Sequence, residues 1–85
     1  FTISLAQENA KFGITVNTVS PGYVATDMVM AVPEEVRAKI AADIPTGRLG
    51  NPDEIAYAVA FLVADEAGWI TGSNLDINGG HHMGW

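Results

Sequence analysis

The residues best suited to bind a ligand lie in SPGYVATDM, from Ser20 to Met28. This stretch follows an apolar, strand-like run. Gly22 has no side chain, so a flat ring can approach the backbone there, and Pro21 fixes the turn. Thr26 supplies a hydroxyl, and nearby backbone N–H groups can hold an amide or an anion. These residue types at this spacing predict one wall of a cofactor site. The alternative is an ordinary strand-to-helix loop, because Pro-Gly is a common turn dipeptide.

The other candidate groups fit structural roles more simply than catalytic ones. Asp53 and Glu54 form a carboxylate pair, but they suit the first turn of a helix, where negative charge complements the dipole. Asp27 likewise suits a turn or helix start rather than a catalytic acid. His81 and His82 are adjacent, so their side chains point apart in an extended tail, and the sequence has no Cys to complete a metal site. No metal site is therefore predicted.

The elements that position these residues alternate between helical and strand-like patterns. Apolar residues at helical spacing predict a helix from Phe1 to Lys11, and Gly13 is the usual kind of residue to end it. β-Branched residues alternate with polar ones from Ile14 to Val19, which predicts a strand. Ser20-Pro21-Gly22 is expected to break that strand.

Two helices and a second strand are expected next. The first helix runs from Pro33 to Asp43, with Val36 and Ile40 on its buried stripe. The second helix runs from Asn51 to Asp65.

The second of these helices is the best specified. Asn51 is a good N-cap, Pro52 suits the first helical position, and Glu54 completes a capping box. Its apolar face is expected to contain the following residues: Ile55, Val59, Leu62 and Val63.

A short strand from Leu75 to Ile77 follows, closed by Gly79-Gly80 and a tail over 81–85. The order helix, strand, loop, helix, helix, strand predicts an α/β chain with two parallel strands joined through helices. Such a pair needs neighbours, because parallel sheets are covered on both faces. The chain also starts at Phe1 inside a predicted helix, so we expect it to be the carboxyl-terminal part of a longer protein.

Composition and charge exclude several function classes. Ten Asp and Glu residues against four Lys and Arg give a net charge of −6, which leaves no basic stripe for nucleic acid or for an anionic membrane. The longest apolar run, Ile55 to Ala64, is too short to span a bilayer. No signal peptide is visible, so a cytoplasmic location is expected. Trp69 and Trp85 are expected to pack in the core or at an interface rather than stack on a ligand.

Two long stretches resemble the short-chain dehydrogenase/reductase family. ITVNTVSPGYVATDM is similar to the strand and loop that carry the family's Pro-Gly motif. GRLGNPDEIAYAVAFLVADEAGWITGSNLDINGG is similar to its last helix and strand. The joint pattern of SPGxxxT, GRxGxPxEIAxxxxFL, ITG and NGG is highly specific, although each piece alone is not. The resemblance covers essentially all 85 residues and implies the carboxyl-terminal portion of a single Rossmann-type NAD(P)-binding domain with a doubly wound parallel sheet.

The resemblance also implies an activity. SPGYVATDM, together with the ending NGGHHMG, is most similar to the members that reduce acetoacetyl-CoA to 3-hydroxybutyryl-CoA with NADPH in polyhydroxyalkanoate synthesis. Members that reduce 3-oxoacyl-(acyl-carrier-protein) in fatty-acid synthesis are the near alternative. NAD is not excluded, because the residues that would meet the 2′-phosphate of NADP are expected upstream.

Roles for single residues follow from the same resemblance. Pro21, Gly22, Tyr23 and Val24 are expected to wall the nicotinamide, with the backbone at Val24 holding its carboxamide. The hydroxyl of Thr26 is expected to hydrogen-bond the cofactor. Gly22 and Tyr23 also match substrate contacts of acyl-CoA reductases, although plain packing remains open for Tyr23.

Larger segments match family features as well. Residues 28–45 match a mobile lid over the substrate. The helix after Asn51 and the strand from Leu75 to Ile77 match surfaces that such enzymes often use to form homotetramers.

The family's catalytic residues have no counterpart here. Its Tyr-x-x-x-Lys motif would lie upstream of Phe1, and Tyr57 has Phe61 where the lysine would stand. Its Gly-rich pyrophosphate loop is also absent from the sequence. We therefore expect no catalytic residue in this chain and no reductase activity from the chain alone. A non-catalytic assembly module that has lost the active site, and a truncated product that does not fold, are the alternatives.

Overall fold

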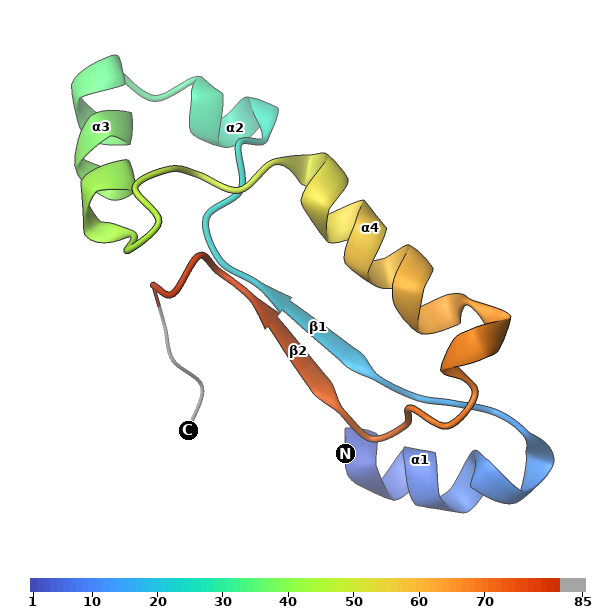
Figure 1. Ribbon diagram of the computed structural model, residues 1–85. Helices are drawn as coiled ribbons and strands as arrows, with labels where there is room; N and C mark the ends of the chain where they lie inside the picture. Colours follow the sequence, from blue (N-terminus) through green and yellow to red (C-terminus); the bar gives the residue numbers. More distant parts are fainter. Residues whose placement is uncertain (82–85) are drawn as a thin grey trace.

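The computed structural model describes residues 1–81 of the chain. In chain order the elements are α1 (Thr2–Asn9), η1 (Ala10–Phe12), β1 (Thr18–Pro21), α2 (Asp27–Met30), α3 (Glu34–Asp43), α4 (Pro52–Val63), η2 (Asp65–Ala67) and β2 (Asn74–Ile77). Figure 1 shows α4 running beside the two strands, α1 near their starts, and α2 and α3 beyond their ends. The two loops that leave the strands therefore emerge at one end of the molecule.

The two strands form a parallel sheet, which confirms the predicted arrangement. Their register runs from Thr18 opposite Asn74 to Pro21 opposite Ile77. The first strand was predicted too early, since it starts at Thr18 rather than Ile14. The expected break at Ser20-Pro21-Gly22 is also wrong, because Ser20 and Pro21 are the last two residues of β1. Proline lacks an N–H donor and is therefore restricted to positions where the ladder does not need one; the bond to the Ile77 carbonyl comes from the Gly22 N–H instead.

The segment before β1 is held by the Asn17 side chain and one backbone bond outside the regular ladder. The Asn17 amide donates to the Ile70 carbonyl at 3.0 Å, and its oxygen accepts from the Ser73 N–H at 3.1 Å and the Ser73 hydroxyl at 2.7 Å. The Val16 carbonyl accepts from the Gly72 N–H at 2.8 Å. These contacts replace the β pairing that the alternating pattern predicted from Ile14 to Asn17.

Helix ends follow local signals closely. Gly13 adopts φ +74° after η1, which is the left-handed conformation that ends a helix. Asn51 caps α4, and the predicted capping box is present. Pro33 is the N-cap of α3 rather than part of its first turn. The short α2 was not predicted, because four residues are too few to display helical periodicity.

The core is small. In the described part of the chain, the buried apolar residues are Ala6, Ile44, Ala58, Leu62 and Ala67. The predicted buried positions Val36, Val59 and Val63 are instead 44%, 44% and 74% exposed, because a two-stranded sheet is too narrow to cover those sides of the helices.

The expectation that Trp69 packs in the core is wrong, because its side chain is fully exposed. The remaining expectation for Trp69, an interface, stays a prediction. His82, Trp85 and most of the predicted tail lie outside the described residues. Among the residues described, no helix is both long enough and apolar enough to cross a membrane.

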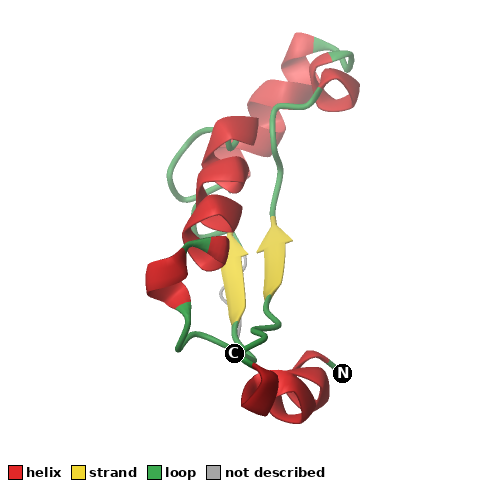
Figure 2. Cartoon of the chain, turned by 90° about the vertical axis from the view of Figure 1, so that its right-hand side faces the viewer, coloured by secondary structure: helices red, strands yellow, loops and turns green. Residues whose placement is uncertain are grey.

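The chain is elongated and open on one side. Its radius of gyration is 15.6 Å, against about 12 Å for a compact chain of this length. Figure 2 shows α4 covering one face of the sheet, while no helix of residues 1–81 covers the opposite face. From Ile55 to Val63, α4 carries no charged residue. A helix that is apolar on all sides is typical of a buried position, yet Tyr57, Phe61 and Val63 of α4 are exposed.

Candidate functional site

The loop predicted to bind a cofactor lies at the carboxyl ends of both strands. Ser20 and Pro21 end β1, the segment from Gly22 to Met28 leaves it there, and residues 78–81 leave β2 beside it (Figure 1). In open parallel α/β sheets, this edge is where ligands bind. The structure therefore places the predicted site at the end of the molecule where the fold class expects one.

Gly22 continues the sheet just beyond the end of β1. Its N–H donates to the Ile77 carbonyl at 2.9 Å. A Cβ atom at Gly22 would lie 2.8 Å from the Cβ and 3.1 Å from the Cα of Asn78. Asn78, the first residue after β2, therefore requires a glycine at this position before any ligand is considered. From the sequence, Gly22 was explained only by the approach of a flat ring to its backbone, so this structural requirement was missed.

The next three residues are held in place by Gly50. The Gly50 N–H donates to the Tyr23 carbonyl at 2.9 Å, and the Ala25 N–H donates to the Gly50 carbonyl at 2.8 Å. These two bonds form a parallel bridge with Val24 at its centre. Within residues 1–81, the Val24 N–H itself makes no backbone hydrogen bond. The group expected to meet a carboxamide is thus a fixed and available donor.

Thr26 has a local role that the sequence interpretation missed. Its Oγ1 accepts a long hydrogen bond, 3.4 Å, from the Val29 N–H and so caps α2, which begins at Asp27. The placement of Asp27 confirms its predicted helix-start role. A hydroxyl that accepts one bond can still donate its own proton. Because Thr26 is exposed, its hydroxyl can donate to a ligand while it caps the helix.

Tyr23 is half exposed and meets a residue of the tail. Its ring approaches the His81 ring edge-on, with 5.7 Å between centroids and 65° between planes. The His81 Nδ1 lies 3.3 Å from the Asp43 carbonyl at the end of α3. His81 therefore links Tyr23 to the helix that belongs to the expected lid.

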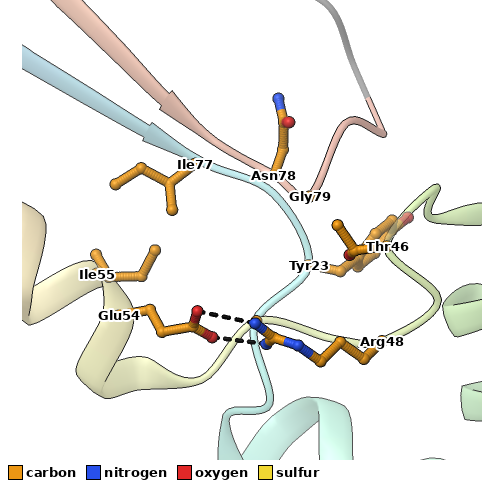
Figure 3. Close-up of a pocket in the computed structure, with 9 residues that line it drawn as sticks. Tyr23, Thr46, Arg48, Glu54, Ile55, Ile77, Asn78 and Gly79 are labelled. Carbon is orange, nitrogen blue, oxygen red and sulfur yellow. Dashed lines mark hydrogen bonds and ion pairs between the residues drawn. The ribbon is translucent and has the colours of Figure 1, made fainter.

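Tyr23 also borders a small cleft between the strand ends and α4 (Figure 3). Its lining residues are Tyr23, Thr46, Arg48, Gly50, Glu54, Ile55, Ile77, Asn78 and Gly79. The cleft encloses about 80 Å³, whereas sites that bury a drug-sized ligand are about 300–1,000 Å³. Pro21, Gly22, Val24 and Thr26 do not line it. The predicted residues thus lie along one short segment, 21–26, that is exposed except at Val24 and Ala25, and they do not enclose a pocket.

An ion pair at the edge of this cleft was not anticipated. Arg48 donates to both oxygens of Glu54, with Nη1–Oε1 at 2.7 Å and Nη2–Oε2 at 3.0 Å (Figure 3). The Glu54 Oε1 also accepts from the Asn51 N–H at 2.8 Å. The hydrogen bond from Arg48, followed by the one from Asn51, lowers the pKa of the Glu54 carboxyl to about 2. The motif GRLGNPDE carries a signal for this pair, an Arg shortly before a capping-box Glu.

The arrangement is suited to binding and orientation. It offers a peptide N–H at Val24, a hydroxyl at Thr26 and an aromatic ring at Tyr23 along one edge. A planar amide can be held by such a set. A redox step needs a bound cofactor as well, because no protein side chain in this wall carries a hydride.

Comparisons with known proteins show that the chain is similar to part of several reductases. A protein-family profile described as Enoyl-(Acyl carrier protein) reductase matches residues 1–82. The acetoacetyl-CoA reductase of Cupriavidus necator is 57% identical over 99% of this chain and 34% of its own length. The acetoacetyl-CoA reductase of Shinella zoogloeoides is 59% identical over 94% of this chain and 34% of its own length.

A second activity is matched at nearly the same identity. The 3-oxoacyl-(acyl-carrier-protein) reductase FabG of Escherichia coli is 55% identical over 98% of this chain and 34% of its own length. The chain thus spans about a third of the length of the curated relatives it matches.

Proposed function

Because the chain belongs to the short-chain dehydrogenase/reductase family, we propose that it is the carboxyl-terminal portion of an NADPH-dependent ketoreductase. The observation that supports this most directly is the Val24 N–H, which the bonds of Tyr23 and Ala25 to Gly50 hold in place and leave available. An available backbone donor at the end of a parallel strand matches what a nicotinamide carboxamide needs.

When bound, NADPH supplies the hydride that reduces a ketone. The residues of this chain bind and orient. The Val24 N–H donates to the carboxamide, and the Thr26 hydroxyl donates to a second cofactor oxygen. Pro21 and Gly22 form the backbone wall beside the ring. Gly22 and Tyr23 face the thioester, and the proton that completes the reduction comes from residues outside this chain. NAD fits the same wall, because none of these contacts involves the 2′-phosphate of NADP.

We place acetoacetyl-CoA first as the substrate. Support comes from three relatives named acetoacetyl-CoA reductase, which are 55%, 57% and 59% identical to this chain. A 3-oxoacyl-(acyl-carrier-protein) is the second candidate, because the relatives named for that activity reach 55%. Met28 is 83% exposed on α2, which supports an apolar lid over the acyl group across residues 28–45.

A graft tests the proposal. In the grafted reductase, the matched stretch of the Cupriavidus necator enzyme is replaced by this chain. We expect ketone-dependent oxidation of NADPH, faster with acetoacetyl-CoA than with acetoacetyl-(acyl-carrier-protein). The isolated 85-residue chain is the control and is expected to be inactive. A folded grafted reductase that does not bind NADPH would contradict the proposal, and activity in the isolated chain would contradict the absence of catalytic residues.

We also propose that the complete enzyme is a homotetramer that uses α4 and β2. The support is apolar exposure, since Tyr57 is 77% and Phe61 is 51% exposed on α4. The same exposure favours the second candidate function, a non-catalytic assembly module. Light scattering of the isolated chain distinguishes them: a cooperatively melting oligomer supports the module, and an aggregate or unfolded monomer supports a dependence on the rest of the enzyme.

A further inference from the structure

Within the cofactor wall, residues 21–26, the part from Tyr23 to Ala25 is fixed by backbone hydrogen bonds. Tyr23 is 47% exposed and Val24 is only partly buried. The contact that fixes this segment is Gly50, which has no side chain and bonds through its N–H and its carbonyl. The direction of the Val24 N–H therefore depends on where the backbone of Gly50 lies.

The turn that contains Gly50 is itself held by Arg48 and Glu54. The Arg48 guanidinium binds both oxygens of the Glu54 carboxylate and also donates to the Leu49 carbonyl at 3.1 Å. The same carboxylate accepts from the Asn51 N–H at 2.8 Å. The backbone on either side of Gly50 is therefore attached to one ion pair. Two parallel bonds fix the direction of a guanidinium as well as its position.

On this geometry we propose that Arg48 and Glu54 are positioning residues for the cofactor: their ion pair holds the turn from Leu49 to Asn51, and through Gly50 it directs the Val24 N–H. The inference rests on the proposed function and deepens it, because it assigns a role in cofactor binding to side chains that do not touch the cofactor.

The experiment uses Arg48→Met, Glu54→Gln and the double variant in the grafted reductase. The matched control is Asp53→Asn, which removes a neighbouring charge from the first turn of α4; within residues 1–81 only the backbone N–H of Asp53, not its carboxylate, bonds to the Asn51 side chain. The measurements are the Kd of NADPH, the KM of acetoacetyl-CoA, the Tm, and hydrogen exchange at the Ala25 amide, which donates to Gly50.

Each single variant is expected to raise the Kd of NADPH roughly two- to fivefold, the range of one exposed but well-formed ion pair. The Kd of NADPH for the double variant should not exceed that of the weaker-binding single variant, because both changes break the same ion pair. Exchange at Ala25 should quicken, and the thioester KM should rise as well, because Gly50 also donates to the Tyr23 carbonyl. Arg48→Lys should restore part of the affinity for NADPH. Asp53→Asn should behave like the unchanged graft.

A purely structural role predicts a different result. In that case the Tm falls in the variants, but the Kd of NADPH and the Ala25 exchange of the folded enzyme do not change, and the inference is overturned. Equal effects from Asp53→Asn also overturn it. If the unchanged graft does not bind NADPH, the proposed function fails first. The exchange measurement then still tests whether the pair holds the wall, and unchanged Ala25 exchange refutes that as well.

Discussion

Replacing Gly22 by alanine tests why the Pro-Gly loop needs a glycine. The φ angle of Gly22 is not in the left-handed range, so backbone conformation alone does not require glycine there. Space does: the added Cβ would lie 2.8 Å from the Asn78 Cβ and 3.1 Å from its Cα. One of the two backbone segments has to move to accommodate it.

The size of this movement can be worked out from the contact. Ordinary contact begins at 3.4 Å, so a separation of 2.8 Å must grow by at least 0.6 Å. Overpacking of this kind costs about 1–3 kcal/mol of unfolding free energy. Since 84 matched residues make up 34% of the Cupriavidus necator enzyme, that enzyme has roughly 250 residues. For a chain of that size, the cost corresponds to a fall in Tm of roughly 2–12 °C.

Activity should fall further than stability. The displaced segment continues directly into Tyr23 and Val24, which we propose to contact substrate and cofactor. A misplacement near 1 Å can reduce a rate about a hundredfold, so we expect a loss in kcat/KM of at least about tenfold for a smaller shift. The assay is NADPH oxidation by the grafted reductase, together with a thermal melt of the same preparation.

Gly68→Ala is the matched control, because Gly68 follows η2 and does not line the cleft at Tyr23. A Cβ there would meet, within 4 Å, only the Asp65 carbonyl at 3.5 Å, which is an ordinary contact, and its φ is −64°. We expect near-normal melting and activity from this variant. If Gly22→Ala melts and turns over like Gly68→Ala, the close approach of Asn78 is not what requires a glycine, and the reasoning is refuted.

Three further changes test other contacts. The pKa of Glu54 is about 2 in the folded chain, against an ordinary 4.5. Between these two values the unfolded chain binds a proton at Glu54 that the folded chain does not bind. The stability that this group contributes is therefore present above pH 4.5 and is lost as the pH falls toward 2. An NMR titration should show this midpoint, and Arg48→Met should return it toward normal. Thr26→Val should weaken the α2 cap by about 0.5–2 kcal/mol and raise the KM of NADPH, whereas Thr26→Ser should do neither. Asn17→Ala should lower the unfolding free energy by about 1–3 kcal/mol in a chemical melt, and an unchanged melt would show that its bonds to Ile70 and Ser73 do not hold the sheet.

Much of the local structure could be predicted from the residues alone. Gly13 ends the first helix, and Asn51 with Glu54 starts α4, because these signals act within a few residues of each other. The parallel pairing followed from helices placed between two strand-like runs. The stretch SPGYVATDM was also placed at the correct edge, since loops after parallel strands emerge together.

The predictions that failed concern contacts between distant parts of the chain. A β pattern from Ile14 could not reveal that Asn17 would bind Ile70 and Ser73 and delay the strand to Thr18. Apolar positions such as Val63 were assigned to a core because their spacing fits one. Whether a core exists on that side depends on how many strands lie beneath the helix.

The sequence alone was enough to predict most of the elements and the family, because capping, turn chemistry and periodicity depend on residues close together in the chain. The path of the chain in space decided three other features: the residue that lies against Gly22, the backbone that holds Val24, and the side of α4 that stays uncovered. Asn78 and Gly50 reach their positions only when the second strand and the turn before α4 return to the end of β1. No local pattern encodes that distance, so the glycine requirement and the Arg48–Glu54 support of the wall became visible only in three dimensions.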